Sequence, residues 1–235
     1  MACRYFVTGT DTDVGKTRVV ATLARALIES GEHPTIVKFV QTGLKAEEEG
    51  DASHAARIAA PLDRVPIASL ELARFVKPAD PWSAALAQET PPLRAADLAA
   101  AVNALQGHIV TEGSGGLAVP INESEHFGFV AAMADLEVIL TVGLRLGCIN
   151  HALLSLGLCE QMNLRLAGAI LVERWGPTDA DYRADVERSL RSRVDIIGVL
   201  PFTLDERVAV EQGAQHFEKL VRQDCMGAPR QGIRG

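Results

Sequence analysis

The sequence predicts a single α/β domain in which a mostly parallel sheet of about seven strands carries helices on both faces. Three observations support this fold class. Short apolar runs alternate with stretches of helical periodicity, as in consecutive βαβ units. The first apolar run leads through a glycine-bounded loop into a helix that opens near Lys16 and Thr17. With 235 residues and a hydrophobic fraction of 48%, the chain can bury one substantial core.

Composition argues against several classes of protein. The net charge of −7 disfavours a nucleic-acid-binding surface, so phosphate-binding charge has to be local. The four cysteines lack metal-ligand spacing and are expected to be reduced and structural. We find no signal-peptide pattern and no apolar run long enough for a membrane span. We therefore expect a cytoplasmic protein with one domain over residues 1–222 and a disordered tail over residues 223–235.

The first strand, loop and helix predict a phosphate-binding site. Residues 5–7 indicate a buried strand, residues 9–15 a turn-rich loop and residues 19–30 a helix. Backbone N–H groups of such a loop converge on an anion, with a lysine for the β- and γ-phosphates and a hydroxyl for Mg²⁺. Gly9 lies one residue earlier than in the usual phosphate-loop pattern. The context still indicates a phosphate-loop NTPase type of fold.

A second strand, over residues 34–38, is predicted to end at Lys38, on the edge of the sheet that carries the loop. A lysine at this point is either a solvated strand end or a second cation for the nucleotide. Asp51 begins a helix and is a candidate N-cap. We interpret residues 61–81, which contain four prolines, as a long covering segment without regular structure.

The next strand, over residues 108–111, is predicted to end at Glu112 and a glycine-rich turn over residues 113–116. A carboxylate at a strand end beside a phosphate loop is a candidate for the magnesium side of the site. The glycines allow the backbone to approach a ligand closely.

The rest of the chain continues the same alternation. Further helices are predicted over residues 82–88, 97–106, 127–134, about 149–163, 179–192 and 206–222, and further strands over residues 137–143, 166–172 and 195–200. The strand over residues 166–172 ends at Glu173, and the last strand is followed by a turn at Pro201.

Taken together, two lysines, one hydroxyl and two carboxylates at neighbouring strand ends form the chemical groups that phosphoryl transfer requires. We find no Ser-His-Asp or Cys-His arrangement at a recognisable spacing. His54, His126 and His216 are interpreted as surface or loop histidines.

Four motifs in this order resemble the dethiobiotin synthetase family. They are Gly-Thr-Asp-Thr-Asp-Val-Gly-Lys-Thr at 9–17, Lys38 with Thr42-Gly43, Glu-Gly-Ser-Gly-Gly at 112–116 and Leu-Gly-Cys-Ile-Asn-His at 146–151. The resemblance spans residues 1 to about 222, and the longer phosphate loop is the form found in that family.

The resemblance implies a homodimer that makes dethiobiotin from 7,8-diaminononanoate, CO₂ or bicarbonate, and ATP, with Mg²⁺ as cofactor. One amine of the substrate takes up CO₂ as a carbamate, which ATP phosphorylates to a mixed anhydride. The second amine then closes the ring and expels phosphate. Neither nucleic acid nor membrane is expected as a partner.

The resemblance also implies a role for each matching residue. The catalytic residues would be Lys38, Lys16 and Thr12. The nucleotide would be bound by Asp13, Val14, Gly15, Lys16, Thr17, Glu112, Gly115, Gly116, Glu173 and Pro201. The substrate would be bound by Thr12, Lys38, Thr42, Gly116, Asn150 and Tyr182, the last two across the dimer, unless they serve only as a helix cap and a packing residue. Mg²⁺ would be held by Thr17, Asp51 and Glu112.

Two residues depart from the family pattern. Glu173 stands where the family usually has an asparagine that reads adenine, and a carboxylate only accepts hydrogen bonds whereas an amide also donates. The preference for adenine is therefore in question. Arg145 replaces a common lysine, which keeps the charge and changes its geometry.

Two other functions are compatible with the phosphate loop. One is an ATP-dependent synthetase of the cobyrinic acid type, although such enzymes generally carry a glutaminase domain, for which we expect no room after residue 222. The other is a switch ATPase that positions partners or binds membranes, although the stretch over residues 206–222 is mixed in charge rather than basic.

Overall fold

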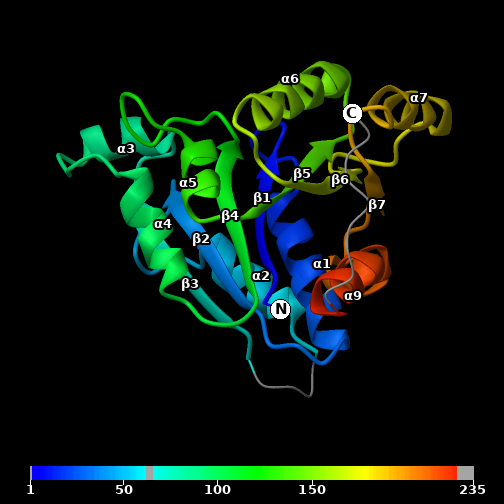
Figure 1. Ribbon diagram of the computed structural model, residues 1–235, viewed down its shortest axis with the longest axis horizontal. Helices are drawn as coiled ribbons and strands as arrows, with labels where there is room; N and C mark the ends of the chain where they lie inside the picture. The colour runs from blue at the N-terminus through cyan, green and yellow to red at the C-terminus, as the bar shows by residue number, and fades with distance from the viewer. Residues whose placement is uncertain (1, 62–65, 227–235) are drawn as a thin grey trace.

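The computed structural model describes residues 2–61 and 66–226, and these contain one seven-stranded sheet with the order β3-β2-β4-β1-β5-β6-β7 (Figure 1). Every neighbouring pair of strands is parallel. The strands are β1 (Arg4–Gly9), β2 (Thr35–Thr42), β3 (Ala68–Phe75), β4 (Ile109–Gly116), β5 (Glu137–Gly143), β6 (Leu166–Val172) and β7 (Ile196–Leu200). The predicted fold class is confirmed, and the central position of β1 places its loop in the middle of the sheet edge.

Helices cover both faces of the sheet (Figure 1). They are α1 (Lys16–Glu29), α2 (Asp51–Ala59), α3 (Pro81–Ala87), α4 (Ala95–Asn103), α5 (Phe127–Met133), α6 (Cys148–Gln161), α7 (Ala180–Leu190), α8 (Glu206–Gly213), the 3₁₀ turn η1 (Ala214–Phe217) and α9 (Glu218–Met226). Alternate residues of β1 serve the two layers: Tyr5 and Val7 pack with α1, α2 and the C-terminal helices, whereas Phe6 packs with α3, α4 and α5.

The predicted covering segment over residues 61–81 is wrong, because it contains the edge strand β3. This strand pairs with β2 along its whole length. Leu70 and Leu72 pack on the core from one side, while Glu71 and Arg74 bind each other on the other side. Most β3 residues are only half-buried, so the strand lacks the continuous apolar run of the inner strands. The residues at 62–65 lie outside the described part of the chain.

The strands β2 and β4 both extend beyond their predicted ends. Lys38 is the fourth residue of β2 and Glu112 the fourth of β4, and the two residues are register partners. The expectation that each closes its strand is therefore wrong. Phe39 and Val40 continue β2 as buried residues, and the glycine-rich segment of β4 stays extended as far as Gly116. Both side chains consequently start inside the sheet and not on its rim.

The single C-terminal helix predicted over residues 206–222 is divided into α8, η1 and α9. Gly213 is the last residue of α8, where the chain tightens into the 3₁₀ turn. The last helix continues to Met226, so it passes the boundary expected at residue 222, and residues 227–235 of the expected tail lie outside the described residues. None of the helices in the described ranges is long and apolar enough to cross a membrane.

Candidate active site at the carboxyl edge of the sheet

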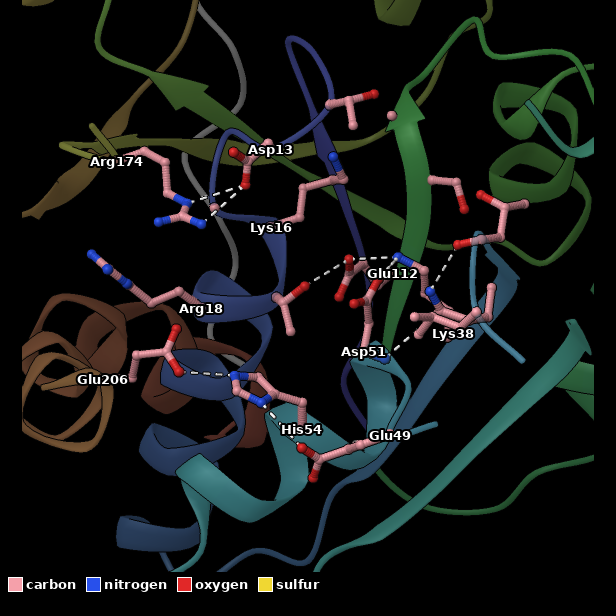
Figure 2. Close-up of a pocket in the computed structure, with 18 residues that line it drawn as sticks. Asp13, Lys16, Arg18, Lys38, Glu49, Asp51, His54, Glu112, Arg174 and Glu206 are labelled. Atoms are coloured by element: carbon pink, nitrogen blue, oxygen red, sulfur yellow. Dashed lines mark hydrogen bonds and ion pairs between the residues drawn. The ribbon is translucent and has the colours of Figure 1, made fainter. Parts of the chain in front are cut away.

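A cavity of about 550 Å³ lies where the loops after β1, β2, β4 and β6 meet (Figure 2). This is the edge at which open parallel sheets bind their ligands. Its walls are formed by Thr12, Asp13, Gly15, Lys16, Thr17, Arg18, Lys38, Gln41, Thr42, Leu44, Glu49, Asp51, His54, Glu112, Ser114, Gly115, Arg174 and Glu206. Ten of the residues predicted from the sequence are among them, from Thr12 in the loop to Gly115 in β4.

The loop after β1 is fixed by close packing. Gly15 has a φ of 95° and is the N-cap residue of α1, and a side chain there would meet Val172 of β6 at 2.9 Å. Val14 is buried, so only its backbone can face a ligand. The first turn of α1 therefore presents its N–H groups to the cavity, as the sequence predicted for a phosphate.

Lys16 is buried under this loop, and its Nζ donates to the carbonyl of Asp11 at 2.9 Å. Burial lowers the pKa of Lys16 to about 8, with Glu112 opposing the shift and Lys38 adding to it. The ammonium group thus lies in a site where a bound anion would strongly favour its charged form.

Lys38 is held between two carboxylates. Its Nζ lies 2.7 Å from Oε1 of Glu112 and 2.6 Å from Oδ2 of Asp51, and it also donates to the carbonyl of Gly113 at 3.2 Å. Burial opposes the charge of Lys38, but the two carboxylates outweigh it and raise the pKa of its ammonium group. Lys38 is therefore a fixed, fully charged cation deep in the cavity (Figure 2).

The oxygen atoms around Glu112 suit a hard divalent cation. Thr17 donates its hydroxyl to Oε1 of Glu112 at 3.1 Å, and Oε2 of Glu112 is buried without a hydrogen-bond partner among the described residues. Asp51 adds a second carboxylate from the first turn of α2, whose N-cap is Gly50 and not Asp51 as the sequence suggested. The described residues form no cluster of three or more His, Cys, Asp and Glu side chains that could hold a metal, so a site here depends on the Thr17 hydroxyl.

The glycine-rich end of β4 touches the phosphate loop. A side chain at Gly116 would meet the carbonyl of Gly9 at 3.0 Å, and one at Gly115 would meet Val119 at 2.8 Å and the Thr12 hydroxyl at 3.4 Å. Thr42, the last residue of β2, lies on the cavity wall. The structure thus brings Thr12, Thr42 and Gly115 to the same cavity as Lys38 and Lys16, whereas Gly116 packs against the loop at Gly9 and does not line the cavity wall.

Asn150 and Tyr182 lie outside this cavity. Asn150 is exposed in the first turn of α6, whose N-cap is Gly147, so Asn150 is not the cap. The hydroxyl of Tyr182 donates to the carbonyl of Arg145 at 2.6 Å and lies 3.4 Å from Sγ of Cys148. Burial, together with Cys148, raises the pKa of Tyr182 to about 12.

Glu173 and Pro201 also lie outside the cavity wall, at the ends of β6 and β7. Glu173 is buried, with Oε2 accepting from the amide of Phe202 at 3.1 Å and Oε1 from Arg183 at 3.4 Å. The carbonyl of Pro201 accepts a hydrogen bond from Arg18 at 3.3 Å. The two predicted residues are therefore close to each other and to the start of α1.

Several wall residues were not predicted to belong to the site, and His54, interpreted from the sequence as a surface or loop histidine, lies in α2 on the cavity wall. His54 joins α2 to α8, with Nε2 2.9 Å from Glu206 and Nδ1 3.5 Å from Glu49. Its position three residues after Asp51, on the same helix face, was the available signal. Arg174 binds Asp13 and follows Glu173 directly, whereas nothing in the sequence indicated Glu206.

The sequence matches one family model and is similar to named proteins along most of its length. A family model described as an AAA domain matches residues 3–206. The ATP-dependent dethiobiotin synthetase BioD of Pseudescherichia vulneris is 35% identical over 231 residues, which are 92% of this chain and 91% of that protein. The ATP-dependent dethiobiotin synthetase BioD 1 of Escherichia coli (strain K12) is 32% identical over 212 residues, or 86% and 92% of the two chains.

Solved structures resemble the chain in fold. The septum site-determining protein MinD of Pyrococcus horikoshii OT3, complexed with Mg-ADP, aligns with a TM-score of 0.60 at 15% identity over 95% of this chain and 97% of that one. Cobyrinic acid a,c-diamide synthase from Mycobacterium smegmatis gives 0.60 at 16% identity over 97% and 96%. At this identity the two structures show a shared architecture only.

Proposed function

Because the chain belongs to the family of ATP-dependent dethiobiotin synthetases, we propose that the cavity at its sheet edge is where it forms dethiobiotin from 7,8-diaminononanoate, CO₂ and ATP. The protein is thus an ATP-dependent ligase of biotin biosynthesis, as the sequence motifs had indicated. The observation that carries the proposed site is Lys38, a buried ammonium group within hydrogen-bond distance of both Asp51 and Glu112.

The chemistry requires cations at two points. One amine of the substrate adds to CO₂ and loses a proton, which leaves a carbamate with a negative charge. A carbamate oxygen then attacks the γ-phosphorus of ATP, and the bond from that phosphorus to ADP breaks. The second amine attacks the carbamate carbon, the bond from that carbon to the phosphorylated oxygen breaks, and phosphate leaves with that oxygen.

In the proposal, Lys38 and Lys16 bind different negatively charged groups. Lys38 holds the carbamate, because its charge is fixed by two carboxylates and its ammonium group faces the same cavity as the loop. Lys16 breaks its hydrogen bond to the carbonyl of Asp11 and binds the transferred phosphoryl group instead. The N–H groups of the loop and of α1 hold the remaining phosphates.

Thr17, Asp51 and Glu112 would hold Mg²⁺. The fit rests on the buried, unpartnered Oε2 of Glu112 and on an all-oxygen donor set. When bound, the ion neutralises charge on the phosphate oxygens. We also propose a cytoplasmic location, because ATP is supplied there.

A homodimer would complete the substrate site. Asn150 and Tyr182 would reach the carboxylate of 7,8-diaminononanoate across the subunit boundary, while Thr12 and Thr42 line the cavity of the same subunit and Gly116 would contact the substrate beside them. The support is apolar surface at α6, where Leu146 is 93% exposed and Leu154 66% exposed. The measurement is analytical ultracentrifugation, and a monomer at all concentrations would contradict this part of the proposal.

The nucleobase would be read by Glu173 and the backbone at Pro201. A carboxylate can accept a hydrogen bond from the amino group of adenine, cytosine or guanine but cannot donate one. Glu173 is therefore proposed to permit several nucleoside triphosphates and not to select ATP strictly.

The proposed function is tested by mixing the protein with ATP, Mg²⁺ and bicarbonate, with and without 7,8-diaminononanoate. We expect ADP formation to depend on the diamine and to match the amount of ureido product measured by mass spectrometry. ATP hydrolysis that is indifferent to the diamine, or that yields no ureido product, would refute the assignment.

A further inference from the structure

Arg174 forms an exposed ion pair with Asp13, a carboxylate of the phosphate loop. Arg174, which follows the end of β6, places Nε and Nη2 at 3.2 and 3.1 Å from Oδ1 of Asp13 (Figure 2). The two side chains are 40% and 62% exposed, and both residues line the cavity. An ion pair this open to water contributes little to stability, so another anion can replace Asp13 as the partner of Arg174.

The arginine lies on the side of the loop away from Lys38. In the strand order, β4 and β2 flank β1 on one side and β5, β6 and β7 on the other. Figure 2 accordingly shows Lys38 with Asp51 and Glu112 to one side of Lys16, and Arg174 with Arg18 to the other. If the transferred phosphoryl group faces Lys38, the α- and β-phosphates extend towards the two arginines.

Arg18 places a second positive charge on the part of the cavity wall that carries Arg174, and this favours binding of an anion there. Arg18 is buried and lines the cavity, and its guanidinium group has a hydrogen bond to the carbonyl of Pro201. Burial lowers the pKa of Arg18, and the nearby charge of Arg174 lowers it further, with Glu206 opposing both. Two guanidinium groups therefore line the same cavity as the Asp13 carboxylate.

We propose that Arg174 exchanges its ion pair with Asp13 for the α- or β-phosphate of the bound nucleotide, and that this exchange frees the Asp13 carboxylate for an ammonium group of the diamine. The inference rests on the proposed function, since it assigns both ligands of the exchange to the same cavity. Arg174 is then a positioning residue that couples nucleotide binding to diamine binding.

The exchange is favourable because the α- and β-phosphates add negative charge beside the guanidinium group, and each can accept two parallel hydrogen bonds from it. Asp13 in turn gains a cation that Arg174 would otherwise repel. The two ligands must therefore bind with positive coupling, and the coupling is reciprocal: each strengthens the other by the same factor. Couplings of this kind typically amount to about 5- to 150-fold.

The test measures diamine binding by calorimetry, in buffer freed of CO₂ so that the amines stay as ammonium groups. The dissociation constant of 7,8-diaminononanoate is compared with and without a non-hydrolysable ATP analogue and Mg²⁺. In the wild type we expect binding at least about five-fold tighter with the analogue. In Arg174→Gln no arginine covers the Asp13 carboxylate in either state, so the analogue should change diamine binding by less than about five-fold, which is below the usual range of such couplings.

Two further variants separate the exchange from a general effect. Arg174→Lys keeps the charge and should retain part of the coupling. Arg165→Gln removes another exposed arginine, bound to Asp135 at 3.1 Å and absent from the cavity wall, and should retain all of the coupling. Full coupling in Arg174→Gln, or no coupling in the wild type, would overturn the proposal.

Failure of the exchange is distinguishable from failure of the proposed function. If the wild type forms ureido product but shows no coupling, only the role of Arg174 is refuted. If the wild type forms no ureido product, the assignment of both ligands fails, and the exchange fails with it.

Discussion

Lys38 and Glu112 are register partners on adjacent strands, and their side chains meet inside the protein with Nζ 2.7 Å from Oε1. Their side chains are only 3% and 2% exposed. The strand pairing therefore fixes a charge pair at the base of the cavity before any ligand is present. Asp51 adds its carboxylate from α2 at 2.6 Å.

This relationship predicts a stability cost for breaking the pair. Removing one partner of a buried ion pair leaves the other charge uncompensated and typically costs about 3–5 kcal/mol. In urea titrations we expect the free energy of unfolding of Lys38→Ala to be lower than that of the wild type by this amount. We also expect the variant to lose turnover. The double variant Lys38→Met with Glu112→Gln should recover stability but not activity. An equal loss of stability in the single and double variants would contradict the uncompensated charge as the cause.

Nucleotide binding should take up protons above pH 8. The pKa of Lys16 is about 8 in the free protein because of burial, and phosphates favour its charged form. The pKa of Lys16 therefore rises on binding, and the complex holds more protons than the free protein between about pH 8 and the ordinary lysine range. Calorimetry in buffers of different ionisation enthalpy measures this uptake. It should vanish in Lys16→Met, and an equal uptake in that variant would show that another group is responsible.

The same shift has a consequence for the unliganded protein. The folded pKa of Lys16 lies below its unfolded value, so the unfolded chain binds more protons between about pH 8 and 10.5. The contribution of Lys16 to the free energy of unfolding therefore increases as the pH rises through this window, which stabilises the folded protein. Urea titrations across it should show a steeper rise, or a shallower fall, in wild type than in Lys16→Met.

The metal requirement should depend on Asp51. Chelation of divalent ions should abolish turnover, and Asp51→Asn should raise the Mg²⁺ concentration for half-maximal turnover by about ten-fold or more, because it removes a charged oxygen ligand. Asp97→Asn is the matched control, since Asp97 also lies in the first turn of a nine-residue helix but not on the cavity wall. An unchanged Mg²⁺ requirement in Asp51→Asn would remove Asp51 from the metal site.

Nucleobase selection should change at Glu173. Replacing the carboxylate by an amide adds a hydrogen-bond donor, so Glu173→Gln should shift kcat/KM towards ATP relative to CTP and GTP by about three- to ten-fold. Steady-state kinetics with the three nucleotides measures this ratio. A wild type that binds ATP tightly and has no affinity for CTP or GTP would contradict the role given to Glu173.

The inner strands and the phosphate loop could be predicted from the sequence because they carry strong local signals. The strand over residues 137–143 is confirmed at both ends, since its apolar run is continuous and fully buried. The loop was recognisable from Gly9 to Thr17 because glycines, lysine and hydroxyl all agree in one short segment.

Features that depend on tertiary packing could not be predicted in this way. The edge strand β3 is half-buried and follows a proline-containing stretch, so its residues carry no strong strand signal. Lys38 and Glu112 look like strand ends because charged residues rarely continue an inner strand, and their interior position is stabilised by their pairing with each other and by the ion pair of Lys38 with Asp51. The contacts of His54 and Arg174 join segments that lie far apart in the sequence.

The central claim is that this cavity phosphorylates a carbamate, and it is tested most directly by following oxygen from CO₂. Phosphate that leaves during ring closure keeps the carbamate oxygen that attacked ATP. In rapid single turnovers with ¹⁸O-labelled CO₂, 7,8-diaminononanoate and ATP, we predict that the released phosphate carries the label. Released phosphate without label, formed together with ureido product, would contradict the carbamate as the group that accepts the phosphoryl from ATP.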